Sequence, residues 1–293
     1  MRAISTLVAM VSTMLLTAPA QAAEPQAGVH TMKLGDFTIV ALQDALNSRP
    51  LAALVANPEE QAKTPGAAAA PDPSPLPVAA LLVDTGTQAA LIDTGLGDPA
   101  GKTLARLRDA GYDPARIGAV LLTHMHGDHI GGLLTADGKA AFPQAQIYVN
   151  RRETAFWFAA DNAGAQKAKA ALAPYQAAGR VTQFDGAATV LPGIAASPAY
   201  GHTPGHTGFM IESAGQRLLM WADIVHVQAL QFANPNVSVN FDVDKDEARE
   251  TRKAFLADAA RQGYLVAGTH IAFPAIGHVR ADGAGYRWEP LAE

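Results

Sequence analysis

The chain has 293 residues, of which 49% are hydrophobic and 17% charged; this composition suits one large domain or two small ones with a sizeable core, and it excludes a disordered chain. The 22 basic and 27 acidic residues give a net charge of −5, with no basic run longer than Arg151-Arg152, so neither nucleic acid nor an anionic membrane surface is expected as a partner. Because cysteine is absent, disulfides, thiolate ligands and cysteine nucleophiles are excluded, and any metal must be held by nitrogen and oxygen.

The first 22 residues have the pattern of a secretory signal peptide. Arg2 supplies a positive charge, residues 4–16 are mostly apolar, and Ala20-Gln21-Ala22 forms an A-x-A cleavage signal. The alternative is an uncleaved anchor, but the apolar stretch is short and rich in Ser and Thr for a membrane span. We expect cleavage near Ala22 and a mature protein that is periplasmic or secreted, without a membrane partner.

The first half of the mature chain contains strand signals on either side of a Pro- and Ala-rich segment. In chain order we expect a strand over 37–42, a loop over 57–77, a hairpin of 78–84 and 89–93, a helix over 102–110 and a buried strand over 119–122. The 57–77 segment should form neither helix nor sheet, because Pro lacks the N–H donor and fixes φ. Since it separates two strands of one sheet, we interpret it as a surface loop and candidate lid within a single domain over 23–293.

The second half alternates helices and strands. We expect helices near 151–160 and 163–178, strands near 181–184 and 194–197, a hairpin of 209–212 and 217–221, a helix over 244–261 and a strand over 264–267. No repeat and no change of composition marks a second domain. Strands and helices in both halves predict an α/β fold in which helices cover two packed sheets, a four-layer α/β/β/α sandwich.

Three histidines and one aspartate lie within the six residues from His124 to His129, directly after the strand over 119–122. Imidazole and carboxylate groups suit zinc and similar divalent ions, and a loop at a strand end can aim several of them at one point. The alternative is a polar loop with incidental histidines. His124, His126, Asp128 and His129 in this register make chance a poor explanation, so we interpret the run as a metal site.

Further histidines and an aspartate follow predicted strands or turns downstream of this loop. His206 lies in a tight turn that begins at His202, Asp223 follows the apolar run LLMWA, and His270 follows YLVAGT. Taken singly, each has an ordinary explanation as a polar turn or a strand-ending residue. Their repetition at strand ends predicts that they converge with the loop cluster on one centre.

Four motifs together resemble those of a known family. THMHGDHIGG from Thr123, TPGHT from Thr203, AD from Ala222 and GTH from Gly268 are similar, in order, to the metal motifs of the metallo-β-lactamase-fold hydrolases. LGDFTIVALQD, FPQAQIYVNRRETAFW and the tail from KAFLADAARQ resemble the subgroup of methyl parathion hydrolase and dihydrocoumarin-type lactonases. The resemblance spans nearly the whole mature chain. It implies an exported, often dimeric enzyme with two divalent ions, expected to be zinc, that opens aryl lactones, cleaves aryl esters or hydrolyses phosphotriesters.

The resemblance also implies roles for individual residues. It assigns two ligand sets and a bridge: His124, His126 and His206; Asp128, His129 and His270; and Asp223 between the two metals. An anionic bridge reduces the repulsion between two cations, and the cations lower the pKa of bound water, so a metal-bound hydroxide is the expected nucleophile. Asp128 and Asp223 are therefore the catalytic candidates, Asp128 as a proton shuttle to the leaving oxygen.

Aromatic residues are candidates for the substrate side, because bulky rings near a metal site favour aryl substrates. The candidates are Phe156, Trp157, Phe241 and Phe273, with Phe232 as a further one. An aromatic residue is more often part of the core, and Phe156 and Trp157 are adjacent on a helix and cannot both face the metals.

Two local departures from relatives bear on the substrate. His226 stands three residues after Asp223, where acyl-homoserine-lactone hydrolases of this fold place a Tyr nearby, so His226 is a further substrate-side candidate. The 160–175 segment is shorter and less aromatic than in the parathion hydrolase. Lactones and esters are therefore favoured over phosphotriesters.

The remaining polar residues receive supporting roles. Asp44 is expected to support the ligands or the local structure and not to bind a metal, because Ala45 replaces a Gly found in relatives; His30, His202 and His278 are expected to make hydrogen bonds within loops or to the metal ligands. Two other classes stay open: an iron-dependent oxidase or dioxygenase on the same fold, and a non-catalytic metal-binding module. Metal content separates these from a two-metal hydrolase.

Overall fold

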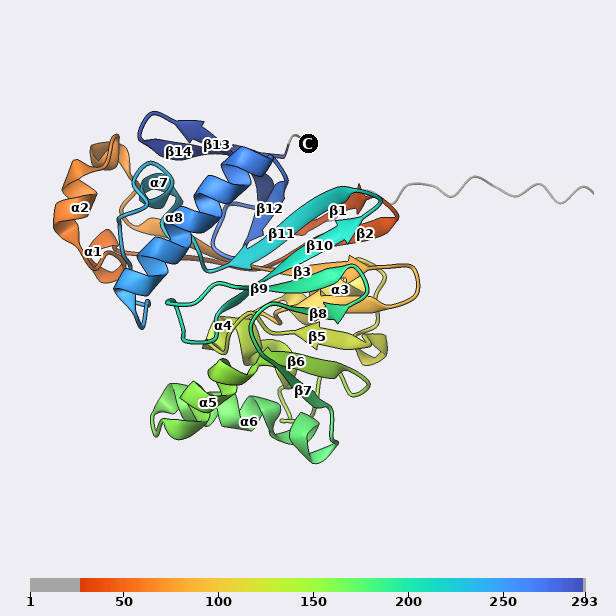
Figure 1. The fold of residues 1–293 in the computed structure, drawn as a ribbon. Helices are drawn as coiled ribbons and strands as arrows, with labels where there is room; N and C mark the ends of the chain where they lie inside the picture. The colour runs from red at the N-terminus through yellow and green to blue at the C-terminus, as the bar shows by residue number, and fades with distance from the viewer. Residues whose placement is uncertain (1–26, 292–293) are drawn as a thin grey trace, which may run out of the picture.

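A computed structural model describes residues 27–291 and contains two seven-stranded sheets (Figure 1). The first sheet follows chain order: β1 (Val29–Leu34), β2 (Phe37–Arg49), β3 (Ser74–Asp84), β4 (Ala89–Ile92), β5 (Ala119–Leu121), β6 (Gln146–Asn150) and β7 (Val181–Phe184). The second runs in reverse order from β14 (Gly285–Pro290) through β13 (Ile276–Asp282), β12 (Leu265–Gly268), β11 (Gln216–Ala222), β10 (Thr207–Ser213) and β9 (Ile194–Pro198) to β8 (Ala188–Leu191).

Apolar side chains from both sheets form one buried cluster between them. Ile39 and Leu121 of the first sheet share this cluster with Phe209, Ile211 and Met220 of the second. Strands with apolar side chains on both faces need a cover on each side, and accordingly β5 is buried throughout and β4 from Ala90 onward. The two sheets therefore pack face to face as the inner layers of the molecule.

Helices form the two outer layers, as Figure 1 shows. The helices are α1 (Leu51–Leu54), α2 (Pro58–Lys63), α3 (Thr103–Asp109), α4 (Gly127–Ile130), α5 (Arg151–Ala159), α6 (Ala163–Ala177), α7 (Gln228–Gln231) and α8 (Lys245–Gln262). α3, α5 and α6 bury apolar residues against the first sheet, and α8 buries Leu256 and Ala259 against the second. The predicted four-layer α/β/β/α sandwich is confirmed.

Strand direction determines where the site can form. β4, β5, β6 and β7 are mutually parallel, and so are β11 and β12. Because parallel strands end at the same edge of a sheet, the residues that follow them are brought together. Asp93 and His124 follow β4 and β5, and Asp223 and His270 follow β11 and β12.

The prediction for residues 57–77 was wrong. α2 begins with Pro58 at its first position, where the missing N–H is not needed, and Ser238 N donates to Asn57 Oδ1 just before it (2.8 Å). Residues 74–77 extend β3 and pair with β2. The prolines there are tolerated because β4 pairs with β3 only from Leu81 onward, so within residues 27–291 no strand pairs with the other edge of residues 74–77. The segment is anchored to the domain instead of forming a loop.

The other predicted helices and strands are confirmed, with small changes at their ends. The strand predicted over 37–42 continues to Arg49 past an irregularity at Asp44. β1, β6, β8, β13 and β14 were not predicted. In β13 and β14 the alternating charged residues hide the strand pattern, and the structure pairs them across the hairpin: Arg280 Nε lies 2.7 Å from Glu289 Oε2.

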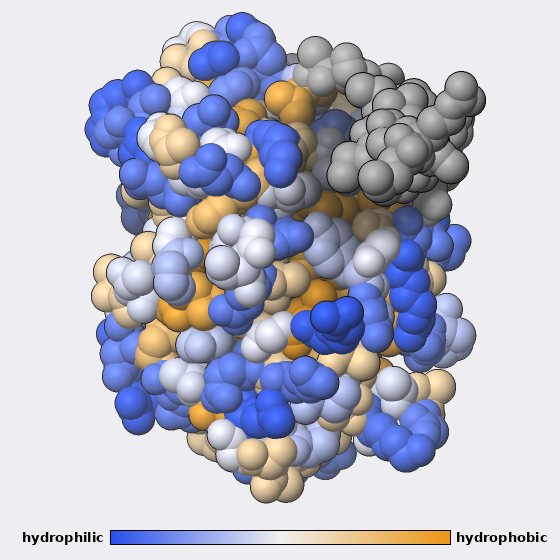
Figure 2. Space-filling model, turned by 90° about the vertical axis from the view of Figure 1, so that its right-hand side faces the viewer, coloured by the Kyte–Doolittle hydropathy of each residue, from blue (hydrophilic) through white to orange (hydrophobic). Residues whose placement is uncertain are grey.

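No helix within residues 27–291 is long and apolar enough to cross a bilayer. Figure 2 shows a face with hydrophilic residues over most of its area and smaller hydrophobic areas between them. The predicted signal peptide lies outside the described residues.

Candidate metal centre

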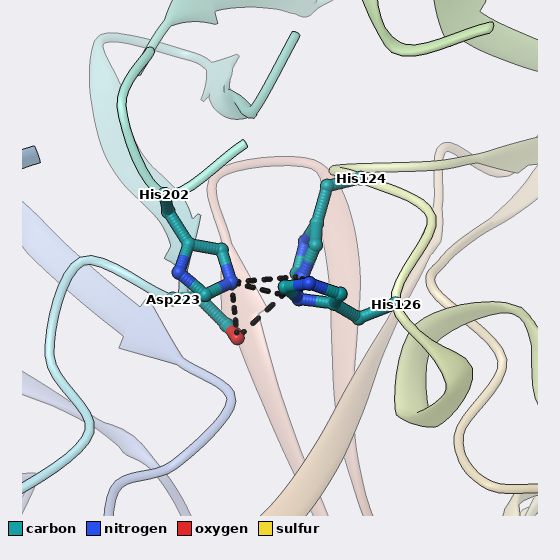
Figure 3. A group of neighbouring side chains, drawn as sticks. All are labelled: His124, His126, His202 and Asp223. Carbon is teal, nitrogen blue, oxygen red and sulfur yellow. Dashed lines mark hydrogen bonds and ion pairs between the residues drawn. The ribbon is translucent and has the colours of Figure 1, made fainter. Parts of the chain in front are cut away.

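Side chains from both sheets meet at the strand ends. His124 and His126 come from the loop after β5, Asp223 follows β11, and His202 lies in the turn between β9 and β10. One ligand atom from each of these four residues lies within 4.8 Å of the others. Figure 3 shows the three rings and the carboxylate pointing toward one another.

The nitrogens of this first group are close enough to share one cation. His126 Nδ1 lies 2.9 Å from His124 Nε2 and 3.0 Å from His202 Nε2, and the last two atoms are 3.2 Å apart. Asp223 Oδ2 lies 3.3 Å from His202 Nε2 and 3.6 Å from His124 Nε2. Three imidazole nitrogens and one carboxylate oxygen form a donor set that zinc and similar ions accept.

A second group lies beside the first and shares Asp223. Asp128, His129 and His270 converge, and Asp223, His226 and His270 form an overlapping set. Asp223 Oδ1 lies 3.2 Å from His129 Nε2, while Asp223 Oδ2 lies 3.2 Å from His270 Nε2 and 3.1 Å from His226 Nε2. The Asp223 carboxylate therefore lies between the two groups.

Hydrogen bonds on the outer ring nitrogens determine which nitrogen faces inward with a lone pair. A carboxylate or carbonyl oxygen can only accept, so each ring must donate to it through Nδ1. Nε2 is then left as the ligand atom. The three bonds are His129 Nδ1 to Asp93 Oδ2 (2.8 Å), His202 Nδ1 to Asp242 Oδ1 (2.9 Å) and His270 Nδ1 to Pro77 O (2.7 Å).

Unpartnered polar atoms at the centre test whether a metal fits. His129 Nε2 and Asp223 Oδ1 are buried, and neither has a hydrogen-bond partner among residues 27–291. A buried polar atom without a partner costs about 1–3 kcal/mol, so such atoms are rare without a reason. A cation held by the two atoms would compensate both. The donor set is thus suited to binding a metal.

The electrostatics of the centre divide its imidazoles into two kinds. Burial opposes the charged form of His129, His202 and His270, but Asp223 and neighbouring carboxylates outweigh burial and raise the pKa of all three, that of His202 to about 9. Burial and the neighbouring His129 hold the pKa of His124 well below its usual value, and burial together with His202 lowers the pKa of His126 to about 3. Burial opposes ionisation of Asp223, but the surrounding imidazoles, His129 first, outweigh it and hold the Asp223 pKa well below its usual range. The negative charge of Asp223 therefore faces two imidazoles held neutral and three whose protons a bound cation would displace.

The structure places His202 in the first group in place of the predicted His206. The two residues are four positions apart in one turn, and the turn directs their rings differently. His206 Nδ1 donates to Ala199 O (2.8 Å), and its Nε2 accepts from Asp223 N (3.4 Å). His206 is thus bonded to the backbone of Ala199 and Asp223, and among residues 27–291 it is in none of the groups that could hold a metal. The other six predicted ligands do lie in these groups.

A cavity of about 340 Å³ opens onto the centre. Of the predicted substrate-side residues, His226 and Phe241 line it. Leu76, Val78 and Leu96 also line it, and the sequence had not indicated them. This gives the cavity an apolar side next to the metal-binding groups.

Four predicted substrate-side residues do not line this cavity: Phe156, Trp157, Phe232 and Phe273. Trp157 is buried in the core beneath His126, where its Nε1 donates to Glu153 Oε1 (2.6 Å), and Phe156 packs beside it. Phe273 packs on the cluster between the sheets. Phe232 lines a different cavity. These four aromatic side chains pack in or against the hydrophobic core, which is where aromatic residues are most often found.

Buried acidic residues around the ligands were missed by the sequence. Asp93 accepts from His129 and from Thr123, and Asp242 accepts from His202 and from the guanidinium of Arg252. Asp93 ends a predicted strand, as Asp223 does, so strand-end position was an available signal for it. Asp242 had no such signal in the sequence.

Glu153 connects two of the ligand-bearing loops. Its Oε1 accepts from Met125 N (2.9 Å), between His124 and His126. Its Oε2 accepts from Thr203 Oγ1 (2.7 Å) and Gly205 N (3.0 Å), in the turn that carries His202. Asp44, in contrast, is structural, as expected: it accepts from the backbone N–H groups of Leu96, Lys102 and Thr103. His30 and His278 lie in β1 and β13 and belong to none of the metal-binding groups.

Comparisons with known proteins agree with this arrangement. Residues 73–270 match the family model described as the metallo-beta-lactamase superfamily. The crystal structure of the hydrolase AbOPH, of the beta lactamase superfamily, is 31% identical and has a TM-score of 0.84, covering 92% of this chain and 99% of that one. AidC, a dizinc quorum-quenching lactonase in complex with a product, is 26% identical with a TM-score of 0.81, covering 91% and 98%.

One curated relative matches over a shorter region. Ribonuclease Z of Pyrococcus furiosus (strain ATCC 43587 / DSM 3638 / JCM 8422 / Vc1) is 34% identical over 87 residues, which is 30% of this chain. The chain spans a quarter of the length of that relative. The match therefore covers only part of each protein.

Proposed function

The chain belongs to the metallo-β-lactamase superfamily as a metal-dependent hydrolase, and on this premise we propose that it opens lactones and cleaves aryl esters with two divalent cations, which we expect to be zinc. The observation that carries the proposal is the position of Asp223 between two convergent ligand groups. A structural metal site is closed and needs one such group. Two groups that share a carboxylate beside an open cavity favour catalysis.

The residues divide into two ligand sets. His124, His126 and His202 would hold one cation, Asp128, His129 and His270 the other, and Asp223 both. Cations bound there would supply Lewis acidity toward the substrate's carbonyl oxygen and would lower the pKa of a water molecule. The negative charge of Asp223 reduces the repulsion between the two positive charges.

Asp128 is the residue of this set that is best placed to handle a proton. Its side chain is 26% exposed and lines the cavity, with Oδ2 3.6 Å from His270 Nε2. Burial disfavours its charged form, but His129 and His270 outweigh burial and hold the Asp128 pKa below its usual value. Asp128 is therefore ionised at neutral pH and can accept a proton and pass it to the leaving oxygen.

The neighbours and the cavity support a lactone or ester substrate. AidC is a lactonase with two zinc ions, and it covers nearly the whole of this chain. Leu76, Val78, Leu96 and Phe241 give the cavity an apolar side that suits the body of such a molecule. Because Phe241 is the one aromatic carbon ring among the lining residues, we expect only limited stacking of an aryl group.

A metal titration combined with a substrate panel tests the proposal. Elemental analysis should give two divalent ions per chain, and kcat/KM for dihydrocoumarin should exceed that for methyl parathion. Asp223→Ala should lose most of the activity and at least one ion, since two cations would then lack their shared anion. One ion or none in metal-replete protein would contradict the two-metal centre. A higher kcat/KM for methyl parathion than for dihydrocoumarin would contradict the proposed substrate class and would indicate a phosphotriester hydrolase.

A further inference from the structure

The mouth of the metal cavity carries two cationic side chains that the proposed function does not use. Arg49 ends β2 and Lys167 lies on α6, and both line the cavity while staying exposed to solvent. A Cβ built on Gly127 would lie 3.5 Å from Lys167 Nζ, so the ammonium lies directly over the loop that carries His126 and Asp128. Positive charge therefore reaches the cavity from the end of β2 and from α6.

Neither cation is neutralised by a protein carboxylate. The ion pairs that Lys and Arg side chains make within residues 27–291 involve neither Arg49 nor Lys167. The carboxylates that line the cavity are Asp128 and Asp223, and both belong to the metal-binding groups. In a chain with a net charge of −5, the open end of the cavity is thus left with two uncompensated positive charges.

The lining around these charges is polar on one side and apolar on the other. Asn47 and Arg49 are two residues apart in β2 and therefore point to the same face of the strand, and Asn47 pairs with Leu76 of β3. Leu76 and Val78 lie on that face too and line the same cavity. A molecule that fits this lining has an apolar body next to the metals and a negatively charged end toward the mouth.

We propose that Arg49 and Lys167 are specificity-determining residues that bind an anionic group of the substrate, away from the bond that is cleaved. This rests on the proposed hydrolase function and narrows its substrate class to lactones or esters that carry a carboxylate or a similar anion. A charge-assisted hydrogen bond is stronger than a neutral one, and in a partly enclosed cavity it is less screened than on open surface. Opposite charge at the mouth also speeds the encounter with an anionic substrate.

Two esters of similar length and different charge test this proposal. Mono-4-nitrophenyl glutarate carries a free carboxylate, and 4-nitrophenyl valerate does not. We expect kcat/KM of the metal-replete enzyme to favour the glutarate ester, and Arg49→Gln/Lys167→Gln to lower the glutarate-to-valerate ratio by about tenfold, mainly through KM. Added salt should lower the same ratio in the wild-type enzyme.

Arg108→Gln/Arg116→Gln is the matched control, because it removes the same two charges from α3 and the turn after it, outside the cavity lining. This control should keep the wild-type ratio. A ratio that falls equally in both double variants would indicate a general charge effect and would overturn the proposal, as would an unchanged ratio in the Arg49/Lys167 variant. Equal metal content in all three proteins shows that the centre is intact.

A binding measurement separates this inference from the hydrolase proposal. Glutarate and its monoamide present the same carboxylate to the metals and differ only in the charge at the other end. Calorimetry should show tighter binding of glutarate, and the Arg49/Lys167 variant should lose that advantage. If neither ester is hydrolysed, the proposed hydrolase function is wrong, and the ratio of the glutarate and monoamide affinities alone tests the role of Arg49 and Lys167. Equal affinities for the two ligands would then overturn the inference.

Discussion

At the scale of single residues, the centre depends on which nitrogen of each histidine faces inward. Asp93, Asp242 and the carbonyl of Pro77 accept from Nδ1 of three rings and so leave Nε2 free as the ligand atom. Removing such an outer partner typically costs 10–100-fold in metal affinity or activity, about 1–3 kcal/mol. The buried acids are therefore part of the site although they would not touch the metals.

The two histidines of the β9–β10 turn provide the sharpest test at this scale. His202→Ala should bind about one ion per chain in place of two, with activity reduced by about 100-fold or more, since a ligand matters more than its outer partner. His206→Ala should keep both ions and lose up to about tenfold, because the hydrogen bonds of His206 go to the backbone of Ala199 and Asp223. Elemental analysis of both purified variants is the measurement; the reverse pattern would show that His206 is the ligand.

At the scale of elements, α5 connects the loop after β5 to the turn between β9 and β10. Glu153 accepts four hydrogen bonds, two at each carboxylate oxygen, from Met125, Trp157, Thr203 and Gly205. Two of these donors belong to the turn that carries His202, and one lies between two histidines of the other loop. The helix thus sets the distance between ligands that are almost 80 residues apart in sequence.

Replacing Glu153 by Gln tests this connection. An amide nitrogen would face two of the four donors and leave buried N–H or O–H groups unpaired, so the free energy of unfolding should fall by about 1–3 kcal/mol. Metal affinity should fall as well, because both loops lose a common partner. Urea unfolding and chelator competition measure the two effects, and Glu250→Gln on the exposed face of α8 is the control. Unchanged metal affinity would limit Glu153 to a stabilising role.

Trp157 of the same helix should behave as a core residue. Its ring is buried and packs beneath His126, so Trp157→Ala should lower the free energy of unfolding by about 3–5 kcal/mol. The loss of activity should be similar for aryl and aliphatic lactones, because the ring does not line the cavity. Kinetics on dihydrocoumarin and an aliphatic lactone provide the comparison. A loss of activity that is larger for the aryl lactone than for the aliphatic one would indicate that Trp157 contacts the substrate.

At the scale of the whole molecule, the site exists because two sheets meet. The loop after β5 belongs to the first sheet, whereas Asp223 and His270 follow strands of the second. Each sheet alone would present an incomplete donor set. Because the ligands come from both, metal binding should stabilise the packing of the two halves, and removing the ions with a chelator should lower the melting temperature.

Export and assembly also belong to this scale, and both are proposals. We propose that the signal peptide is removed, leaving a mature N-terminus near Ala23, and that the exported protein is a homodimer. The first follows from Arg2, the apolar stretch and Ala20-Gln21-Ala22, and the second from the family resemblance. Native mass spectrometry of material from the periplasm or medium measures both masses at once. Retention of Met1 would contradict cleavage, and a monomer at micromolar concentration would contradict the dimer.

The sequence by itself determined the fold class and most of the donor set. Strand and helix periodicities predicted the α/β/β/α layers, and the run from His124 to His129 indicated a metal site from residue type and spacing alone. These signals are local: a buried strand is apolar throughout, a ligand loop follows a strand directly, and neither depends on what packs against it. They fail where charged or proline residues hide a strand, as in β13, β14 and residues 74–77.

Only the tertiary structure decided which side chains face the centre. His202 and His206 share one turn, and a sequence motif does not say which ring the turn directs toward Asp223. Trp157 and Phe241 look alike as bulky apolar residues, but only packing assigns one to the core and the other to the cavity. The direction of a side chain depends on backbone geometry and on neighbours distant in sequence, so these assignments required the three-dimensional fold.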